Sequence, residues 1–502
     1  MILDDRGHPI RTKRPAVPVR KPPARIAARY DAAQTGTENQ RHWAAADFLS
    51  ASAAGDRATR STLRARARYE VANNSYAAGI VSTLANYVVG TGARLQMLTE
   101  DVDLNTSVET AFSAWGRAVG LPDKLRLMRA AQCESGEVFG LITNNPRVRH
   151  PVKLDLRLVE ADQVEAPLAG YPFDSRIIEG IVFDEKLLEP VGYCLLRRHP
   201  GDTRPWVGMG LEYDIIDAEN VIHLFRATRP GQIRGIPELT PGLPLFAILR
   251  RYTMAVLGAA EIAALIGGTI ESTAPADADA AEVDPMETFE MDRGTWLTMP
   301  DGWKASQFKA EQPTSAYGEF KHEVLNECGR AVGMPFNLIA ANSSAYNYAS
   351  GRLDHQAFFK GVRIDQQHLE SVVLDRLLAA YLWEAELLGE VSLGTFGFDE
   401  ELPHQWFWDG IEHVDPVKES TADEIDLRTN ATTLAEIYGN RGKDWETELR
   451  QSAKEKATWM ALCNEFGLPT GTAPPRPAGT AMDEDGGAPA DDTSGDNQGE
   501  TP

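Results

Sequence analysis

The spacing of apolar residues changes along the first half of the chain. Apolar side chains recur every three or four residues over 76–88 and 104–119, and a helical pattern continues over 125–139, which predicts amphipathic helices. Over 152–158 apolar residues alternate with charged ones, as is typical of a half-buried strand. Further strands are predicted for IIEGIVF, VGYCLLRRH and NVIHLF. A helical start followed by a strand-rich module therefore makes up this half.

Helical spacing returns in the second half. It predicts helices over 241–266 and 315–332, separated by a proline-containing segment with one short strand-like stretch, WLTM. This order predicts a two-helix stalk with a small irregular module at its tip. The longest predicted helix follows and ends near Glu386. The remaining elements are one short strand and two closing helices, over 405–408, 420–438 and 444–466. The fold class is therefore α+β.

The acidic composition restricts how the protein can meet nucleic acid. The 502 residues carry 73 Asp and Glu against 50 Lys and Arg, a formal net charge of −23. A monomer that grips DNA along its surface is usually basic, so tight sequence-reading binding is disfavoured. A protein that surrounds DNA without adhering to it remains compatible with this charge. The length also predicts more than one compact domain.

Neither the cysteines nor the apolar segments indicate secretion or a membrane span. The four cysteines lie far apart without a CxxC pair, so reduced and mostly buried thiols are expected. The most apolar segment, 253–270, holds Glu261 in its middle, and we expect it to be buried between protein neighbours. Both ends have the composition of disordered tails: residues 1–30 are rich in Pro, Lys and Arg, and residues 469–502 in Gly, Pro, Ala and Asp.

No motif in the sequence supports catalysis. There is no GxxxxGK[ST] phosphate loop, no HExxH and no GxSxG elbow. GTGARL at Gly90 lacks the third glycine of a dinucleotide fingerprint and follows a helical pattern, so we interpret it as a helix end. CESGE at Cys133 is interpreted as a core thiol, and the acidic pairs at Asp101 and Asp277 as solvated turns. We expect no cofactor, no bound metal and no enzymatic activity.

A stripe of arginines is the strongest electrostatic feature of the sequence. Arg57, Arg60, Arg64 and Arg68 recur on one side of a predicted helix. They are candidates for contact with DNA or with an acidic neighbouring subunit. A plain solvated helix face is at least as good an interpretation, because stripes of Lys and Arg usually are one.

The stretch NSSAYNYASGR, residues 342–352, is uncharged apart from its last residue and directly precedes the longest predicted helix. Its amides and hydroxyls, with two tyrosines between them, predict a small, flexible polar loop. Read alone, this is a surface loop that caps the helix, with Ser350 near the helix N-terminus.

Five stretches follow one another along the chain in a recognisable order. They are RARARYEVANNSYAAGIVSTLANYVVGTGARLQ (64–96), RLVEADQVE (157–165), GIVFDEKLLEPVGYCLLRRHP (180–200), VIHLFRATRPGQIRGIPELTPGL (221–243) and NYASGR (347–352). In this order the chain resembles the portal proteins of tailed bacteriophages, in their lambda-like branch. The resemblance covers most of the chain between the tails, but not the segment 271–306.

The resemblance implies a ring, typically dodecameric, at one vertex of the capsid, with DNA entering and leaving through a central channel. The implied parts are a basic arm (1–40), a wing (41–236), a first stem helix (237–268), a clip (269–307), a second stem helix (308–335), a tunnel loop (336–352), a spine helix with the rest of the wing (353–414), crown helices (415–468) and an acidic tail (469–502). The implied channel residues are Asn342, Ser343, Ser344, Tyr346, Asn347, Tyr348 and Arg352.

The implied partners follow from the same resemblance. Because the sequence has no nucleotide-binding motif, a separate ATPase, the large terminase subunit, should drive the DNA. The clip should dock this motor and later the head-completion or adaptor proteins. Further partners are copies of the chain itself, non-specific double-stranded DNA and the major capsid or scaffold proteins, with no membrane. The expected location is the virion, after assembly in the host cytoplasm.

Two alternatives stay open on the sequence. One is a metal-dependent nuclease or hydrolase whose carboxylates fall outside known motifs. The other is a nucleic-acid scaffold protein that forms no closed ring.

Overall fold

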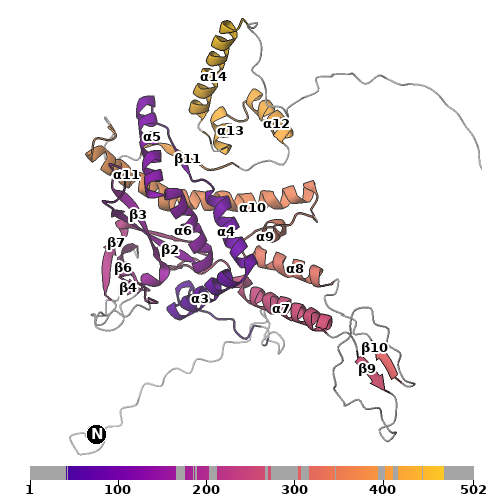
Figure 1. Ribbon diagram of the computed structural model, residues 1–502. Coiled ribbons are helices and arrows are strands. Elements are labelled where there is room, and N and C mark those ends of the chain that lie inside the picture. The colour runs from indigo at the N-terminus through magenta and orange to yellow at the C-terminus, as the bar shows by residue number, and fades with distance from the viewer. Residues whose placement is uncertain are drawn as a thin grey trace, which may run out of the picture. The chain divides into compact units, whose positions relative to one another are not determined.

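Figure 1 shows the computed structural model of the chain. It describes residues 41, 43–165, 176–184, 186, 189–202, 212–265, 269–272, 303–306, 316–344, 346–393, 402–410, 416–441, 443 and 445–467. The chain forms two compact units. The smaller unit comprises Met1–Asp56 and Ala227–Ile233, and its helix α2 (Ala51–Ala54) is capped by Ser50. All elements described below belong to the larger unit, which comprises Arg57–Arg226 and Arg234–Pro502.

The larger unit opens with helices where the arginine stripe and the apolar spacing predict them. They are α3 (Arg57–Asn73), α4 (Ser75–Val89), α5 (Val102–Val119) and α6 (Leu121–Ser135). Asn74 and Asp101 cap the N-termini of α4 and α5 with their side-chain oxygens. Gly90, with φ of +54°, ends α4, which confirms that GTGARL is a helix end and not a nucleotide loop.

The helical pattern predicted over 125–139 is wrong after Ser135. Gly136 has φ of +89°, a left-handed conformation that suits glycine, and ends α6. The chain continues as β2 (Glu137–Asn144), the central strand of an antiparallel sheet in the order β3–β2–β8. The first five residues of β2 are all buried, so no alternation marks them as a strand, and a short buried strand resembles a buried helix turn in sequence.

The other strands largely follow the predicted stretches. β3 (Leu154–Glu160) and β8 (Val221–Phe225) flank β2. A second antiparallel sheet has the order β4–β5–β6–β7, formed by Ile177–Ile178, Ile181–Phe183, Pro190–Leu196 and Tyr213–Asp217. In these two sheets the sequence analysis missed β7 as well as β2. β7 lies at the edge of its sheet and is largely exposed, so no buried apolar face distinguishes it.

The helices α7 (Leu243–Leu265) and α8 (Ala316–Arg330) lie side by side and run in opposite directions (Figure 1). Both were predicted. The ring of Tyr252 lies 5.2 Å from that of Phe320, and at the other end of the pair Gly242 packs against Cys328. Between the two helices, β9 (Thr269–Ser272) and β10 (Trp303–Ser306) pair as antiparallel strands, whereas the predicted strand WLTM lies outside the described residues.

A short helix, α9 (Phe336–Ala340), precedes the longest helical run of the described chain. This run consists of α10 (Tyr348–Leu369), a π-helical turn (Glu370–Leu374) and α11 (Asp375–Leu387). Its end near Glu386 is confirmed. Its start lies inside the segment 336–352, for which the sequence predicted a loop. The predicted strand near Gln405 is confirmed as β11 (His404–Phe407), which pairs with β1 (Arg94–Met97).

The closing region contains α12 (Pro416–Arg428), α13 (Leu434–Asn440) and α14 (Trp445–Glu465). The single helix predicted over 420–438 is wrong, because the chain breaks between α12 and α13. Asn430 has φ of +57°, and Thr433 starts a new helix by accepting a hydrogen bond from the backbone of Glu436. The sequence TNATT contains turn and capping residues. The prediction followed the apolar spacing instead and therefore missed the break.

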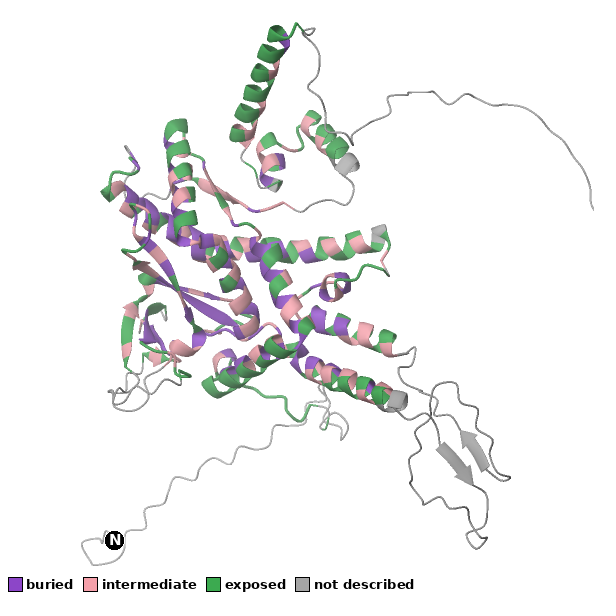
Figure 2. Ribbon diagram, viewed as in Figure 1, coloured by how far each residue is buried: buried purple, intermediate pink, exposed green. Residues whose placement is uncertain are grey.

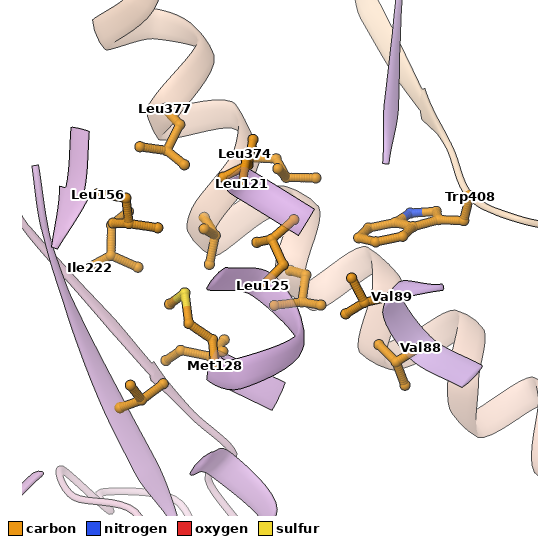
Figure 3. Close-up of a cluster of buried hydrophobic side chains, with 14 of the residues drawn as sticks. Val88, Val89, Leu121, Leu125, Met128, Leu156, Ile222, Leu374, Leu377 and Trp408 are labelled. Atoms are coloured by element: carbon orange, nitrogen blue, oxygen red, sulfur yellow. The ribbon is translucent and has the colours of Figure 1, made fainter. Parts of the chain in front are cut away.

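One hydrophobic core joins α6, the β3–β2–β8 sheet and the long helical run. Figure 3 shows Leu125 and Met128 of α6 between Leu156 and Ile222 of the sheet on one side and the chain near Val88 on the other. Trp115 is fully buried and donates its indole N–H to the carbonyl of Leu154 at 2.9 Å. All four cysteines are buried and free, as predicted.

Candidate nucleic-acid interface

The segment between α9 and α10 carries most of the predicted channel residues. α9 ends at Ala341, whose φ of +48° turns the chain out of the helix. The backbone N–H of Asn342 donates to the carbonyl of Asn337 at 3.1 Å, and the side-chain oxygen of Asn342 accepts from the N–H of Ser344 at 3.0 Å. These bonds form a defined Asx turn where the sequence predicted only a flexible loop.

Asn347 provides the N-cap of α10. Its Oδ1 accepts a hydrogen bond from the backbone N–H of Ser350 at 2.9 Å, and its own N–H donates to the Ser350 hydroxyl at 3.3 Å. This reciprocal arrangement is a capping box, and it explains why α10 begins at Tyr348. Ser350 does lie near the helix N-terminus, as predicted. The capping side chain, however, is Asn347.

The predicted channel residues differ in exposure. The exposed ones are Asn342, Ser343, Ser344, Asn347 and Arg352. Tyr346 is half-buried and packs against the hydrophobic core, so it anchors the turn and is only partly available to a ligand. Tyr348 opens α10, and its side chain lies outside the described part of the structure.

The exposed groups are mainly uncharged hydrogen-bond donors. The Oδ1 atoms of Asn342 and Asn347 are both engaged with backbone N–H groups. Each residue therefore keeps its Nδ2 amino group without a partner among the described residues. An amide N–H and a serine hydroxyl can donate to a phosphate oxygen without adding a full positive charge.

The sequence analysis missed a cationic face on α10. Lys360 and Arg363 follow Arg352 by about two and three helical turns, and at 3.6 residues per turn the three fall within about 80° of the helix circumference. All three are exposed, and none forms an ion pair with another described residue. Their spacing was the available signal, but it lies beyond the loop to which the sequence drew attention.

The structure corrects the role predicted for Arg60 and Arg64. They are 3% and 4% exposed, and Arg60 pairs with Glu179 at 2.6 Å. Arg64 pairs with Asp162 at 2.8 Å and with Glu137 at 3.1 Å. The predicted contact with DNA or with another subunit is therefore wrong for these two residues, because their guanidinium groups are buried within the subunit.

The outer members of the arginine stripe are also paired, but less buried. The side chain of Arg57 is 46% exposed and lies 3.4 Å from Glu165, and that of Arg68 is 31% exposed and lies 2.9 Å from Glu160. An interface or DNA-contact role for Arg57 and Arg68 stays a prediction.

Glu137 is the centre of this buried ionic cluster. Its fully buried carboxylate accepts from Arg234 at 2.7 Å, from His223 Nε2 at 3.0 Å and from the backbone N–H of Gly235 at 2.8 Å, besides Arg64. Burial opposes ionisation of Glu137, but the Arg234 guanidinium and these hydrogen bonds outweigh it and hold its pKa well below the usual range. The cluster fastens α3 and the chain after β8 to the central strand.

A family comparison decides what kind of protein this is. The sequence profile of the family described as "Phage portal protein, lambda family" matches residues 38–366. The chain belongs to the lambda family of phage portal proteins. This match includes the turn at 341–347 and most of α10, and it confirms the resemblance on which the sequence analysis relied.

Known relatives of this portal protein include one curated protein from a phage. It is 25% identical to the "Probable portal protein" of Halomonas phage phiHAP-1 over 473 residues, which cover 88% of each chain. Similar solved structures include the neck of an empty gene transfer agent (GTA) particle, with 15% identity, 75% and 92% coverage of the two chains and a TM-score of 0.46. The neck of a native GTA particle has 14% identity, 74% and 90% coverage and a TM-score of 0.41.

The membership assigns this portal protein to the capsid vertex of a phage particle and to a structural class of proteins. It confirms the expectation that the protein is not an enzyme. The mixed helix and sheet content agrees with the predicted α+β class.

Among the described residues, Glu160, Asp162 and His199 lie close enough together for their side chains to hold one metal ion. The alternative of a metal-dependent nuclease would require such a site. Arg68 lies 2.9 Å from Glu160 and 2.8 Å from Asp162, so a guanidinium already neutralises these carboxylates. His199 Nδ1 accepts from the backbone N–H of Gly201 at 3.0 Å, which leaves its proton on Nε2, the atom that faces the carboxylates. The group is better described as an ion-pair cluster of the portal protein.

Proposed function

We propose that this portal protein forms a closed ring, dodecameric as is typical of the family, through whose channel double-stranded DNA passes during packaging and ejection. The polar turn at the head of α10 lies within the tunnel loop, residues 336–352, and its exposed residues Asn342, Ser343, Ser344 and Asn347 face the passing duplex. The observation that supports this placement is the conjunction of an exposed, uncharged donor surface with a match to the portal family over the same residues. The DNA contact is non-specific.

The chemistry of the turn suits a duplex that must keep moving. A loop repeated around a ring meets the duplex many times, so a cation in every copy would add salt-dependent phosphate contacts and slow sliding. A carboxylate in every copy would repel the backbone. Ser343, Ser344 and the amino groups of Asn342 and Asn347 offer weak hydrogen bonds that exchange as the phosphates pass. Arg352 lies at the edge of this surface, one turn into α10.

The remaining parts follow the same proposal. Helices α7 and α8 form the stem, residues 269–307 the clip, α10 with α11 the spine, and α12 to α14 the crown, with the earlier helices and sheets as the wing. The clip docks the large terminase subunit and later the head-completion or adaptor proteins. The wing contacts the major capsid or scaffold proteins. Assembly takes place in the host cytoplasm.

A lysine in the turn tests the channel placement. Ser344→Lys should leave the ring intact but reduce packaged DNA by about tenfold or more, most strongly at low salt, because each copy gains a phosphate contact. The matched control is Ser107→Lys, the same change at an exposed position of α5. Both variants are assayed by ring assembly and by the length of packaged DNA. If the Ser344→Lys variant packages DNA of full length, the turn does not lie in the channel.

A further inference from the structure

Helix α7 leaves one apolar side uncovered within the chain. Figure 2 shows that α7 carries exposed residues along its length. Ile248, Met254 and Leu257 are 57%, 65% and 58% exposed, and with Arg251 they occupy one half of the helix at intervals of three residues. The opposite half is buried, at Phe246, Leu249 and Val256. By length and composition alone, Thr240–Glu261 also qualifies as a candidate membrane span. Either a protein surface or a lipid surface could therefore cover this side.

Arg251 distinguishes between these two surfaces. It is exposed in the middle of the apolar side and forms no ion pair with another described residue. Its neighbour Arg250, by contrast, pairs with Glu70 at 3.3 Å and lies over the ring of Tyr69. A guanidinium that is covered by an apolar surface needs an anionic partner, because loss of its hydration is otherwise costly. The covering surface should therefore be apolar and carry a carboxylate.

The outer side of α8 has this composition. Glu319, Glu323 and Glu327 recur every four residues, and all three are exposed. Phe320 lies at the edge of this row, where its ring contacts Tyr252 of the same chain, and it is 47% exposed. Glu319 and Glu327 have no ion-pair partner among the described residues, and Glu323 lies 3.3 Å from His322. The outer side of α8 thus offers unpaired carboxylates, with the exposed part of the Phe320 ring at its edge, and complements the cationic and apolar outer side of α7.

The antiparallel pairing of the two helices fixes which glutamate can meet Arg251. Tyr252 is level with Phe320, and Gly242 is level with Cys328. The rotation that relates one subunit of a ring to the next leaves every residue at the same height along the ring axis. When the helices run along that axis, residues that are level within one subunit are therefore also level between neighbouring subunits. Arg251 of one copy then lies within about 3 Å of the height of Glu319 of the next, whereas Glu327 lies about 9 to 12 Å away, at 1.5 Å per residue.

We infer that the outer side of α7 in one subunit packs against the outer side of α8 in the next, with Arg251 paired to Glu319. The inference rests on the proposed ring and names the surface that closes it. Two different surfaces meet in this contact, so it is heterologous, which is the type that generates rings. The exposed side of α7 is covered by a second copy of the chain and not by a membrane.

Charge exchange between the two helices tests the pairing. Arg251→Glu and Glu319→Arg should each abolish rings at a protein concentration at which the wild type forms them, as measured by native mass spectrometry. The double variant Arg251→Glu/Glu319→Arg should restore rings. The control Arg251→Glu/Glu327→Arg carries the same charges but should not, because its new pair is separated along the stem. Circular dichroism of each variant checks that the subunit is folded, and flotation with anionic lipid vesicles tests the membrane.

The outcomes separate the inference from the proposed function. A wild type that forms no ring at any concentration contradicts the proposed function and this contact with it. Rings that persist in both single variants overturn the contact alone. Loss of rings without rescue by Glu319→Arg, or equal rescue by Glu327→Arg, overturns the pairing of Arg251 with Glu319. Flotation of the wild-type protein with the vesicles would assign the exposed side of α7 to lipid.

Discussion

At the residue scale, two arginines of one helix show how burial decides what a charge contributes. Arg64 and Arg57 both lie on α3 and both pair with carboxylates. The side chain of Arg64 is only 5% exposed, and water cannot replace its partners if it is removed. The side chain of Arg57 is 46% exposed, so solvent screens its ion pair and can hydrate Glu165 in its absence.

Replacement of each arginine by methionine should therefore give different results. Arg64→Met leaves Glu137 and Asp162 short of a partner inside the protein and should lower the free energy of unfolding by about 3–5 kcal/mol. Arg57→Met, the matched control, should change it by less than about 1 kcal/mol. Urea denaturation of the two purified variants at equal concentration measures both values. Equal losses would show that α3 does not have the buried environment described here.

The buried histidine of the same cluster makes stability depend on pH. Burial lowers the pKa of His223, so the folded protein favours the neutral ring, which donates Nε2–H to Glu137 at 3.0 Å. The contribution of neutral His223 to the free energy of unfolding is fully present above the pKa of about 6.5 that histidine has in an unfolded chain. It is lost as the pH falls toward the lower pKa of His223 in the folded protein. Stability should therefore decline between about pH 7 and pH 5.

A glutamine at this position isolates the effect, because it keeps an N–H donor for Glu137 but does not titrate. Thermal unfolding of His223→Gln should show a smaller decline than the wild type over the same pH range. Glu137 and Asp162, whose pKa values are lowered despite burial, should weaken both proteins only at lower pH, below about 4. Parallel curves for the two proteins between pH 7 and 5 would exclude His223 as the source.

At the element scale, apolar spacing located most helices and strands but not the points where one type gives way to another. The helix over α5 and the strand β3 could be predicted, because each buries one regular face. The change from α6 to β2 could not, because it depends on the left-handed conformation of Gly136, and the buried residues that follow do not alternate with polar ones. The burial of Arg60 and Arg64 depends on carboxylates far away in sequence, so a helical stripe alone cannot distinguish a paired core from a solvated face.

The start of α10 is a second case in which local hydrogen bonding decides the boundary. The apolar spacing begins near residue 353, whereas the helix begins at Tyr348, because Asn347 and Ser350 form a capping box before the first apolar position. The site itself was half predictable: its polar, uncharged character is visible in the sequence. The packing of Tyr346 against the core became visible only in the folded chain, whereas the spacing of Arg352, Lys360 and Arg363 was available in the sequence and was missed.

Two substitutions of Asn347 separate its capping role from its proposed place in the channel. Asn347→Ala removes the acceptor for the Ser350 N–H and should destabilise the subunit by about 1 kcal/mol while adding no charge to the channel. Asn347→Asp keeps a good capping oxygen, so stability should change little, but a carboxylate in every copy should impair DNA passage. Thermal unfolding and packaged DNA are measured for both. Normal packaging with Asn347→Asp would argue that the turn lies outside the channel.

At the scale of the whole molecule, a net charge of −23 and a match to the portal family fit one physical role. A strongly acidic assembly does not hold DNA by general attraction, so the duplex can move when a separate motor drives it. Within this acidic chain, the exposed cations of α10 follow an uncharged turn, and the exposed glutamates of α8 and the exposed Arg251 of α7 lie on the outer sides of their helices. This distribution suits copies that attract one another more strongly than they attract DNA.

The most direct measurement is an electron cryomicroscopy reconstruction of the purified assembly, viewed along its axis. The account predicts a closed ring around an open bore, with the turn at 341–347 of every copy projecting into that bore. A stable monomer under assembly conditions, or a ring that carries Asn342 and Asn347 on its outer rim, would contradict it.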